Sequence, residues 1–153
     1  MHEFFHVFEN AHHSKWAATD ADLFTYPLDN VGLLARRREE FEALRRALLA
    51  SNADESRCWA AEAIRVRDLR ISALPASALA YERGTELHEG LANYLQVRTA
   101  GKSASFHLSK DEFPTDQVRQ RNYATGTNLA MLLDRLAPGW HKQIERGGPD
   151  SLD

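Results

Sequence analysis

The spacing of apolar residues along the chain predicts a series of helices separated by polar breaks. The clearest helix spans residues 31–50, where Leu34, Phe41 and Leu48 fall on one stripe and charged residues lie opposite. The same pattern predicts further helices at residues 2–13, 56–73, 76–98, 114–136 and 140–146. Loops are expected at residues 14–30, 51–55 and 99–105, and a short strand or irregular stretch at 106–113.

Length and composition indicate one globular domain. The chain has 153 residues, of which 43% are hydrophobic and 27% are charged. A chain of this size can bury a core without disulfides. Since the sequence shows neither repeats nor a long linker, we expect a mainly α-helical, compact domain over residues 1–153.

Charge and hydropathy argue against two classes of partner. The net charge is −3, so no basic excess points to nucleic acid. The run Arg36–Arg38 is followed by Glu39 and Glu40, which favours a self-paired helix surface. No apolar run approaches the roughly 18 residues of a membrane span, and the N-terminus lacks the order of a signal peptide. The expected compartment is therefore the cytoplasm by default.

Several side chains are expected to serve the fold. The single cysteine, Cys58, excludes an intrachain disulfide and is predicted to be a small buried residue and not a nucleophile. Trp59 and Trp140 are predicted to pack in the core. The predicted 56–73 helix carries three arginines, Arg65, Arg67 and Arg70. We expect them either to pair with Glu40 or Glu82 across helices or to face solvent.

Residues 2–6 form an H-E-x-x-H motif. On a helix, His2 and His6 project from one face, so both imidazoles can ligate one Zn²⁺ ion. Glu3 then lies beside the water that the metal activates, where a carboxylate can act as general base. The alternative interpretation is a pair of surface histidines on a short terminal helix.

A catalytic zinc site needs a third protein ligand. His12 occupies the third-ligand position of the metzincin pattern H-E-x-x-H-x-x-G-x-x-H, but Glu9 replaces the glycine at which the backbone must turn. Asp20 and Asp22 are further carboxylates without distinctive surroundings. Glu89 is the stronger candidate, because it belongs to a row of polar residues on one face of the 76–98 helix.

That row contains Glu82, Glu86, Glu89 and Asn93. A buried helix should be apolar on such a face, so the row needs a partner, and a metal with its histidines is one. A solvated acidic face is the alternative, above all for Glu82. Asn93, one turn after Glu89, is placed to hydrogen-bond and orient a ligand histidine. Glu86 is assigned the same supporting role.

The run Glu86–Tyr94, E-L-H-E-G-L-A-N-Y, resembles the E-G-x-A-x-Y segment of gluzincin metallopeptidases. The order of segments over residues 2–147 is similar to that of bacterial gluzincin-like proteins with a long spacer between the two zinc motifs. Arginine-rich helices lie between the motifs, and R-x-Y-A-T-G, a leucine-rich helix and Pro-Gly-Trp follow them. This resemblance implies three zinc ligands and one general base, namely His2, His6 and Glu89 with Glu3.

The resemblance also implies a fold, the helical part of a gluzincin metallopeptidase. In that family a sheet and an earlier helix precede the H-E-x-x-H helix, whereas here the motif begins at residue 2. We therefore expect an N-terminally shortened or reduced relative. Gly90 and Ala92 are small and are expected to let their helix approach the H-E-x-x-H helix closely.

Stabilising an oxyanion requires a hydrogen-bond donor opposite the zinc. We assign this role to Tyr123, with a half-buried core tyrosine as the alternative. Tyr94 is disfavoured because it points about 140° away from Glu89 around the helix, and His107 is a third option.

The sequence thus predicts a zinc-dependent peptidase or amide hydrolase that acts on a peptide or small amide. One alternative is a catalytically inactive zincin-like binding or interaction module, and another is a metzincin-like hydrolase that uses His12. A third is a helical interaction protein in which Phe4, Phe5 and Phe8 bind a partner or a second copy, which would make a homo-oligomer.

Overall fold

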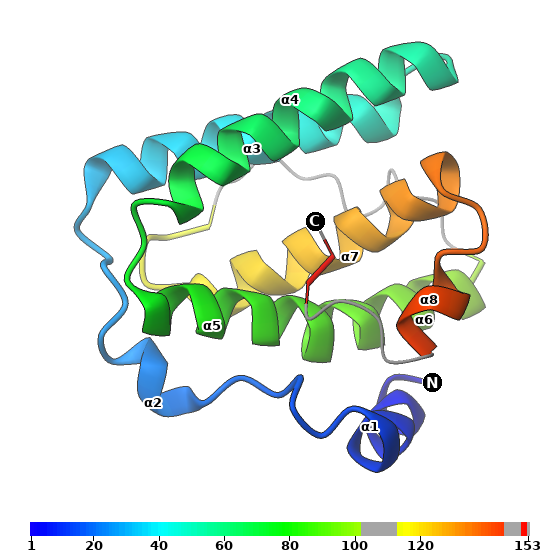
Figure 1. Ribbon diagram of the computed structural model, residues 1–153, viewed down its shortest axis with the longest axis horizontal. Coiled ribbons are helices and arrows are strands. Elements are labelled where there is room, and N and C mark those ends of the chain that lie inside the picture. Colours follow the sequence, from blue (N-terminus) through cyan, green and yellow to red (C-terminus); the bar gives the residue numbers. More distant parts are fainter. Residues whose placement is uncertain (102–112, 146–150, 153) are drawn as a thin grey trace.

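The computed structural model of the protein describes residues 1–101, 113–145 and 151–152, and within these ranges the chain is mainly α-helical, without strands (Figure 1). The mainly helical fold is thus confirmed. The elements are α1 (His2–His12), α2 (Asp20–Leu23), α3 (Val31–Leu49), α4 (Ala53–Ile71), α5 (Ala76–Thr85), η1 (Glu86–Gly90), α6 (Leu91–Thr99), α7 (Val118–Leu136) and α8 (His141–Glu145). Most of the predicted loop at 99–105 and stretch at 106–113, with His107, lies outside the described residues.

The helices form layers with α7 in the middle. The antiparallel pair α3 and α4 lies on one side of α7, and the rod made by α5, η1 and α6 lies on the other (Figure 1). Helix α1 packs against α6, on the side of the rod away from α3 and α4. Helix α1, which carries the H-E-x-x-H motif, and η1, which carries Glu89, thereby lie on the same side of the molecule.

Local side-chain caps fix where α3 and α4 begin. The Asn30 side chain accepts a hydrogen bond from the Leu33 amide at 3.0 Å, and Asn52 accepts one from the Glu55 amide at 2.9 Å. Such caps satisfy amides that the first helical turn leaves free. The second cap makes α4 begin at Ala53, three residues before the predicted start.

The predicted 76–98 helix is continuous but contains one wide turn. Residues Glu86–Gly90 form a π-helical turn between α5 and α6. A π-turn winds one extra residue into the helix, so side chains that follow it are rotated relative to an ideal α-helix, and such turns occur often at functional sites. Both Glu86 and Glu89 lie in this turn.

The rod and α7 cross almost backbone to backbone. A Cβ added to Gly90 would lie 2.7 Å from the Gly126 Cα, and one added to Gly126 would collide with the Glu86 backbone. The expectation that Gly90 allows close approach to the H-E-x-x-H helix is therefore wrong, because this glycine faces α7. The crossing sets Arg119 and Tyr123, on the preceding turns of α7, beside Glu89.

Helix α7 begins later than the sequence predicted. Residues 114–116 form a turn in which the Gln117 amide donates to the Pro114 carbonyl at 3.0 Å, and the helix begins at Val118. Proline followed by Thr115 and Asp116 is as compatible with a turn as with a helix start. The predicted start at 114 is thus wrong by one turn.

The apolar core lies where α3, α6 and α7 meet. Trp140 is buried there, whereas Trp59 is half-buried, with the Arg46 guanidinium 4.6 Å above its ring. Cys58 is exposed, so its predicted burial is wrong, since it lies on the outer face of α4. The most buried core side chains include Leu44, Ala47, Tyr81, Leu87, Ala92, Val118 and Ala130.

A buried ionic network joins α3, α4, α5 and η1. Its members are Arg37, Glu40, Arg67, Arg70, Glu82 and Glu86. Arg70 contacts Glu40 at 2.6 Å and Glu82 at 2.8 Å, so the predicted cross-helix pairs form. Glu82 is fully buried, which rules out the solvated interpretation. Arg65 instead pairs with Glu62 at the surface.

Among the described helices, none combines the length and the hydrophobicity that crossing a bilayer requires.

Candidate metal centre

Helix α1 presents the H-E-x-x-H motif to the rod. His2 and His6 lie one turn apart on the face that packs against η1 and α6, and both are partly buried. Their rings meet edge to face, with centroids 4.8 Å apart. The i, i+4 spacing on a helix therefore places both imidazoles on one face, as predicted.

The carboxylate of Glu89 lies between the two imidazoles. Its Oε2 atom is 3.4 Å from His2 Nε2 and 3.7 Å from His6 Nε2. The three ligand atoms all lie within 4.8 Å of one another. The structure thus brings together three side chains that the sequence analysis named as ligands, across more than eighty residues of sequence.

These separations fit a tetrahedral zinc site. Zinc binds imidazole nitrogen and carboxylate oxygen at about 2.0–2.2 Å, so two donors on one tetrahedral ion lie roughly 3.4 Å apart. The distance from His2 Nε2 to Glu89 Oε2 has this value, and the His6 distance is slightly longer. Three protein ligands would leave the fourth position of a zinc ion open, as catalytic sites require.

Glu89 is held as a carboxylate by two residues of α7. Arg119 Nη2 donates to Glu89 Oε1 at 2.7 Å, and the Tyr123 hydroxyl also hydrogen-bonds this carboxylate. Burial by itself would raise the pKa of Glu89, but the hydrogen bonds from Tyr123 and Arg119 outweigh it and hold the pKa below its usual value. One oxygen is therefore anchored while the other faces the histidines.

Tyr123 lies at the site, as predicted. Its hydroxyl is 3.2 Å from His2 Nε2, and its ring stacks on the His2 ring with centroids 6.0 Å apart. Burial and the neighbouring Glu89 carboxylate raise the pKa of Tyr123 well above its usual value. The phenol thus stays protonated at neutral pH and keeps its hydrogen-bond donor.

Glu3 is exposed on α1, next to His2 in the chain. Its charge contributes to the raised pKa of Tyr123, so the carboxylate lies within electrostatic reach of that hydroxyl. Its exposure leaves the carboxylate open to water, as the predicted role of general base requires.

The two supporting residues predicted from the sequence lie elsewhere. Glu86 pairs with Arg67 at 2.5 Å in the buried ionic network. Asn93 donates to the Thr127 hydroxyl at 2.9 Å and not to a histidine. The π-turn rotates the residues that follow Glu89, so that Asn93 faces α7. Glu86 stands at the start of the turn and faces Arg67 of α4.

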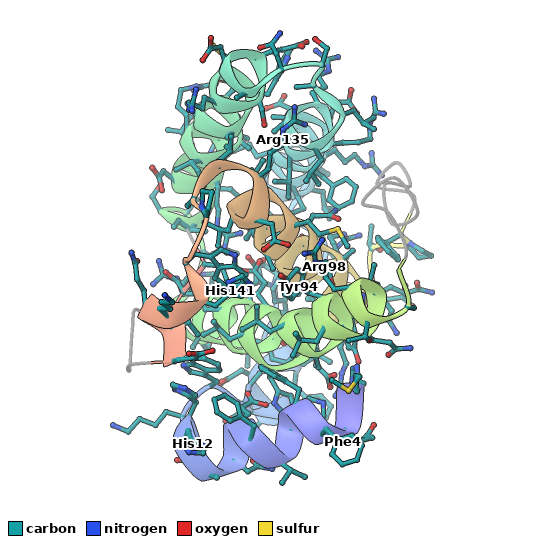
Figure 2. All side chains as sticks on the ribbon, turned by 90° about the vertical axis from the view of Figure 1, so that its right-hand side faces the viewer. Phe4, His12, Tyr94, Arg98, Arg135 and His141 are labelled. Atoms are coloured by element: carbon teal, nitrogen blue, oxygen red, sulfur yellow. The ribbon has the colours of Figure 1, made fainter. Side chains whose placement is uncertain are left out.

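The alternative third ligands are not part of the cluster. His12 is exposed at the opposite end of α1 from Phe4, and its Nδ1 atom lies 2.9 Å from the Phe8 carbonyl (Figure 2). Asp20 lies near the site but is exposed and 3.8 Å from Arg119. Asp22 is partly buried and joins no such cluster among the described residues.

Three residues of the centre were missed in the sequence. Glu9, one turn after His6, is buried and lies 3.1 Å from His6 Nδ1. His88 lies 2.6 Å from the same Glu9 oxygen. Arg119 and Tyr123 share a face of α7 at i, i+4, and this spacing is the signal that would have found the arginine.

Tyr94 points away from the centre, as predicted. Its hydroxyl lies 2.9 Å from both carboxylate oxygens of Asp134 and 3.1 Å from His141 Nε2, beside α8 (Figure 2). These contacts fasten α8 to α6 and α7, and they leave Tyr94 with a structural role.

Two cavities flank the centre. A polar one of about 210 Å³ borders Glu89 and is lined by Asp20, Tyr81, Thr85, His88 and Arg119. An apolar one of about 310 Å³ lies against α1, α6 and α8 and is lined by Phe4, Phe5, Phe8, Leu91, Leu95 and Trp140. The polar cavity thus borders the candidate ligand Glu89, whereas the apolar cavity is lined by none of the three candidate ligands.

Comparison with known proteins gives no match for this chain among family models, curated proteins or solved structures. The function of the chain is therefore inferred from the geometry of its described residues.

Proposed function

We propose that the protein holds Zn²⁺ on His2, His6 and Glu89 and hydrolyses a peptide or small amide. The observation that carries this proposal is the position of Glu89 Oε2, 3.4 Å and 3.7 Å from the two imidazole Nε2 atoms. In this proposal the chain corresponds to the helical part of a gluzincin metallopeptidase, the family that its motifs resemble.

When bound, the ion would supply Lewis-acid chemistry, polarising a carbonyl and lowering the pKa of water. The protein's own residues divide the remaining work. Glu3 accepts a proton from the attacking water and delivers it to the leaving amine. Tyr123 is kept protonated by its surroundings and has one proton, so it would give up its hydrogen bond to Glu89 and donate to the oxyanion that develops on the substrate.

Substrate would enter beside Glu89. The polar cavity of about 210 Å³ borders this residue, and the half-exposed Arg119 is part of its wall. Because Arg119 also anchors Glu89, a substrate that contacts the guanidinium would be held at a fixed position relative to the metal ligands.

Zinc content tests the proposal. Protein purified in zinc-containing medium and desalted is expected to carry about one zinc per chain, and His6→Ala and Glu89→Ala are each expected to carry almost none. His12→Ala is the matched control, since this histidine lies on the same helix outside the cluster, and it should keep its zinc. Wild-type protein without zinc would contradict the proposal, and loss of zinc in His12→Ala would favour the metzincin alternative.

A second candidate function is a helical interaction module. It is favoured by the apolar side chains that α1 exposes, because Phe4 is 75% and Val7 70% exposed, and Phe4 also lines the apolar cavity. Phe5, in contrast, is half-buried against the core. Light scattering over a range of concentrations would detect association between copies, and Phe4→Ser should then shift the protein towards the monomer.

A further inference from the structure

A buried carboxylate lies behind the candidate metal ligands. Glu9 is 1% exposed, and its Oε2 atom is 3.1 Å from His6 Nδ1 and 2.6 Å from His88 Nδ1. Since α1 carries Glu9 and η1 carries His88, this oxygen joins the two elements that also carry the candidate ligands.

The two nitrogens of His6 point to different carboxylates. Nε2 lies 3.7 Å from Glu89 and Nδ1 lies 3.1 Å from Glu9. An imidazole that donates its Nδ1–H to a carboxylate is held in the tautomer whose Nε2 lone pair is free to ligate. Carboxylates behind ligand histidines fix ring orientation and increase ligand basicity in this way.

Half of the Glu9 carboxylate has no partner among the described residues. Its Oε1 atom is buried and accepts no hydrogen bond from that part of the chain. A buried, unsatisfied carboxylate oxygen destabilises a fold. A cation on the far side of the His6 ring would compensate this charge, so the position of Glu9 is explained by a metal held on Nε2.

His6, Glu9 and His88 also form a possible metal-ligand group, but the distances favour a hydrogen bond over a second metal ion between them. Two donors on one tetrahedral ion lie roughly 3.4 Å apart, whereas Glu9 Oε2 and His88 Nδ1 are separated by 2.6 Å. The contact is a hydrogen bond. His6, Glu9 and His88 therefore form one hydrogen-bonded unit behind a single site.

We propose that Glu9 is a positioning residue, which holds His6 with Nε2 towards the metal and, through the same oxygen, fixes His88 in the wall of the polar cavity. This inference rests on the proposed zinc site. It assigns Glu9 no contact with substrate or metal, and His88 is the only member of the unit that lines the cavity beside Glu89.

Zinc affinity of Glu9→Gln tests the inference. We expect competition with a chelating dye to show affinity 10–100-fold weaker than in the wild type, the usual effect of removing such a partner. In excess chelator, the melting temperature of Glu9→Gln should equal or exceed that of the wild type, because the amide removes an uncompensated buried charge. A residue with a purely structural role would lower this temperature and leave the affinity of the folded protein unchanged.

Two further variants serve as controls. His12→Ala changes the same helix outside the cluster and should bind zinc as tightly as the wild type. Glu62→Gln removes an exposed carboxylate of α4 and should change neither quantity. Equal zinc affinity in wild type and Glu9→Gln would overturn the inference and leave the proposed function standing, whereas a wild type that binds no zinc would overturn both.

A measurement on the wild type covers the case in which Glu9→Gln does not fold. Long-range proton–nitrogen NMR spectra of zinc-loaded, ¹⁵N-labelled protein report which histidine nitrogen carries metal and which carries a proton. We expect His6 to show metal on Nε2 and a slowly exchanging proton on Nδ1. Metal on Nδ1, or a rapidly exchanging Nδ1 proton, would overturn the inference.

Discussion

Two buried ionic clusters meet at the π-turn, and they differ in how their charge is balanced. The ionic network on the α3–α4 side contains three arginines and three glutamates, and each carboxylate has an arginine within 2.8 Å. The candidate metal centre on the α1 side combines Glu89 and Glu9 with histidines, and among its described residues only Arg119 is an arginine. The network balances its own charges, whereas in the proposed function the centre takes up an added cation.

The π-turn separates the two clusters. Glu86, at its start, faces Arg67 in the network, and Glu89, three residues later, faces His2 and His6. One turn of helix thus supplies a structural carboxylate to one cluster and a candidate ligand to the other. A buried glutamate beside arginines and one beside imidazoles therefore have different uses, although both lie on one polar row in the sequence.

The largest expected effect is on hydrolytic activity, which the proposed function assigns to the metal centre and not to the ionic network. Replacing Glu3 with Gln removes the general base and should lower the hydrolysis rate about 10²–10⁴-fold, with zinc content unchanged. The measurement is hydrolysis of a peptide library by mass spectrometry, with Glu62→Gln as the surface control. If Glu3→Gln cleaved a wild-type substrate at the wild-type rate, the metal centre would not act through this residue.

The second largest expected effect is on the free energy of unfolding, to which the ionic network contributes. Arg70→Met removes one partner of Glu40 and Glu82 and leaves buried charge behind, so we expect the free energy of unfolding to fall by about 3–5 kcal/mol. Arg65→Met, on the same helix but in an exposed pair, should change it by about 0–1 kcal/mol. Urea unfolding with and without zinc measures both. A loss in Arg70→Met that added zinc restored would show that the two clusters are not independent.

The weakest effect is a pH dependence of the network. Burial by itself would raise the pKa of Glu40, but Arg37, Arg70 and Arg67 outweigh it and lower the pKa to about 2 from 4.5. A carboxyl whose pKa is lowered by folding stabilises the fold at pH values above its pKa in the unfolded chain. This contribution is lost as pH falls from about 4.5 towards 2. Burial raises the pKa of Glu86, so that residue acts in the opposite sense.

Unfolding free energy measured across this acidic range checks the pH dependence. We expect stability to fall in the wild type, and the fall to be shallower in Glu40→Gln, which cannot titrate. The same steepness in both proteins would mean that Glu40 does not carry the effect.

Much of the centre could be predicted because helical spacing is a local rule. His2 and His6 share a face whatever the rest of the fold does, and the polar row made Glu89 a candidate. Asn93 was misplaced because the spacing rule assumes an α-helix, and the π-turn before it ends at the close crossing of Gly90 with Gly126. That crossing is a tertiary contact without a local signal in the sequence.

The residues that support the ligands were harder to find. Glu9 contacts a histidine 79 positions away, and Arg119 contacts a glutamate 30 positions away. Such pairings depend on how α1 and α7 pack on the rod, and helix packing is not encoded in any one segment. The ionic network was partly predicted, because arginines on a helix expected to be buried need acidic partners.

The proposed chemistry depends on Glu89 and two imidazoles sharing one zinc ion. X-ray absorption spectroscopy at the zinc edge of loaded protein is the sharpest test of this coordination, in the wild type and in Glu89→Ala. We expect two imidazole nitrogens and a carboxylate oxygen at about 2.0–2.2 Å in the wild type, and loss of that carboxylate or of the zinc itself in the variant. A wild-type spectrum with fewer than two imidazoles, or one that Glu89→Ala leaves unchanged, would contradict the shared site.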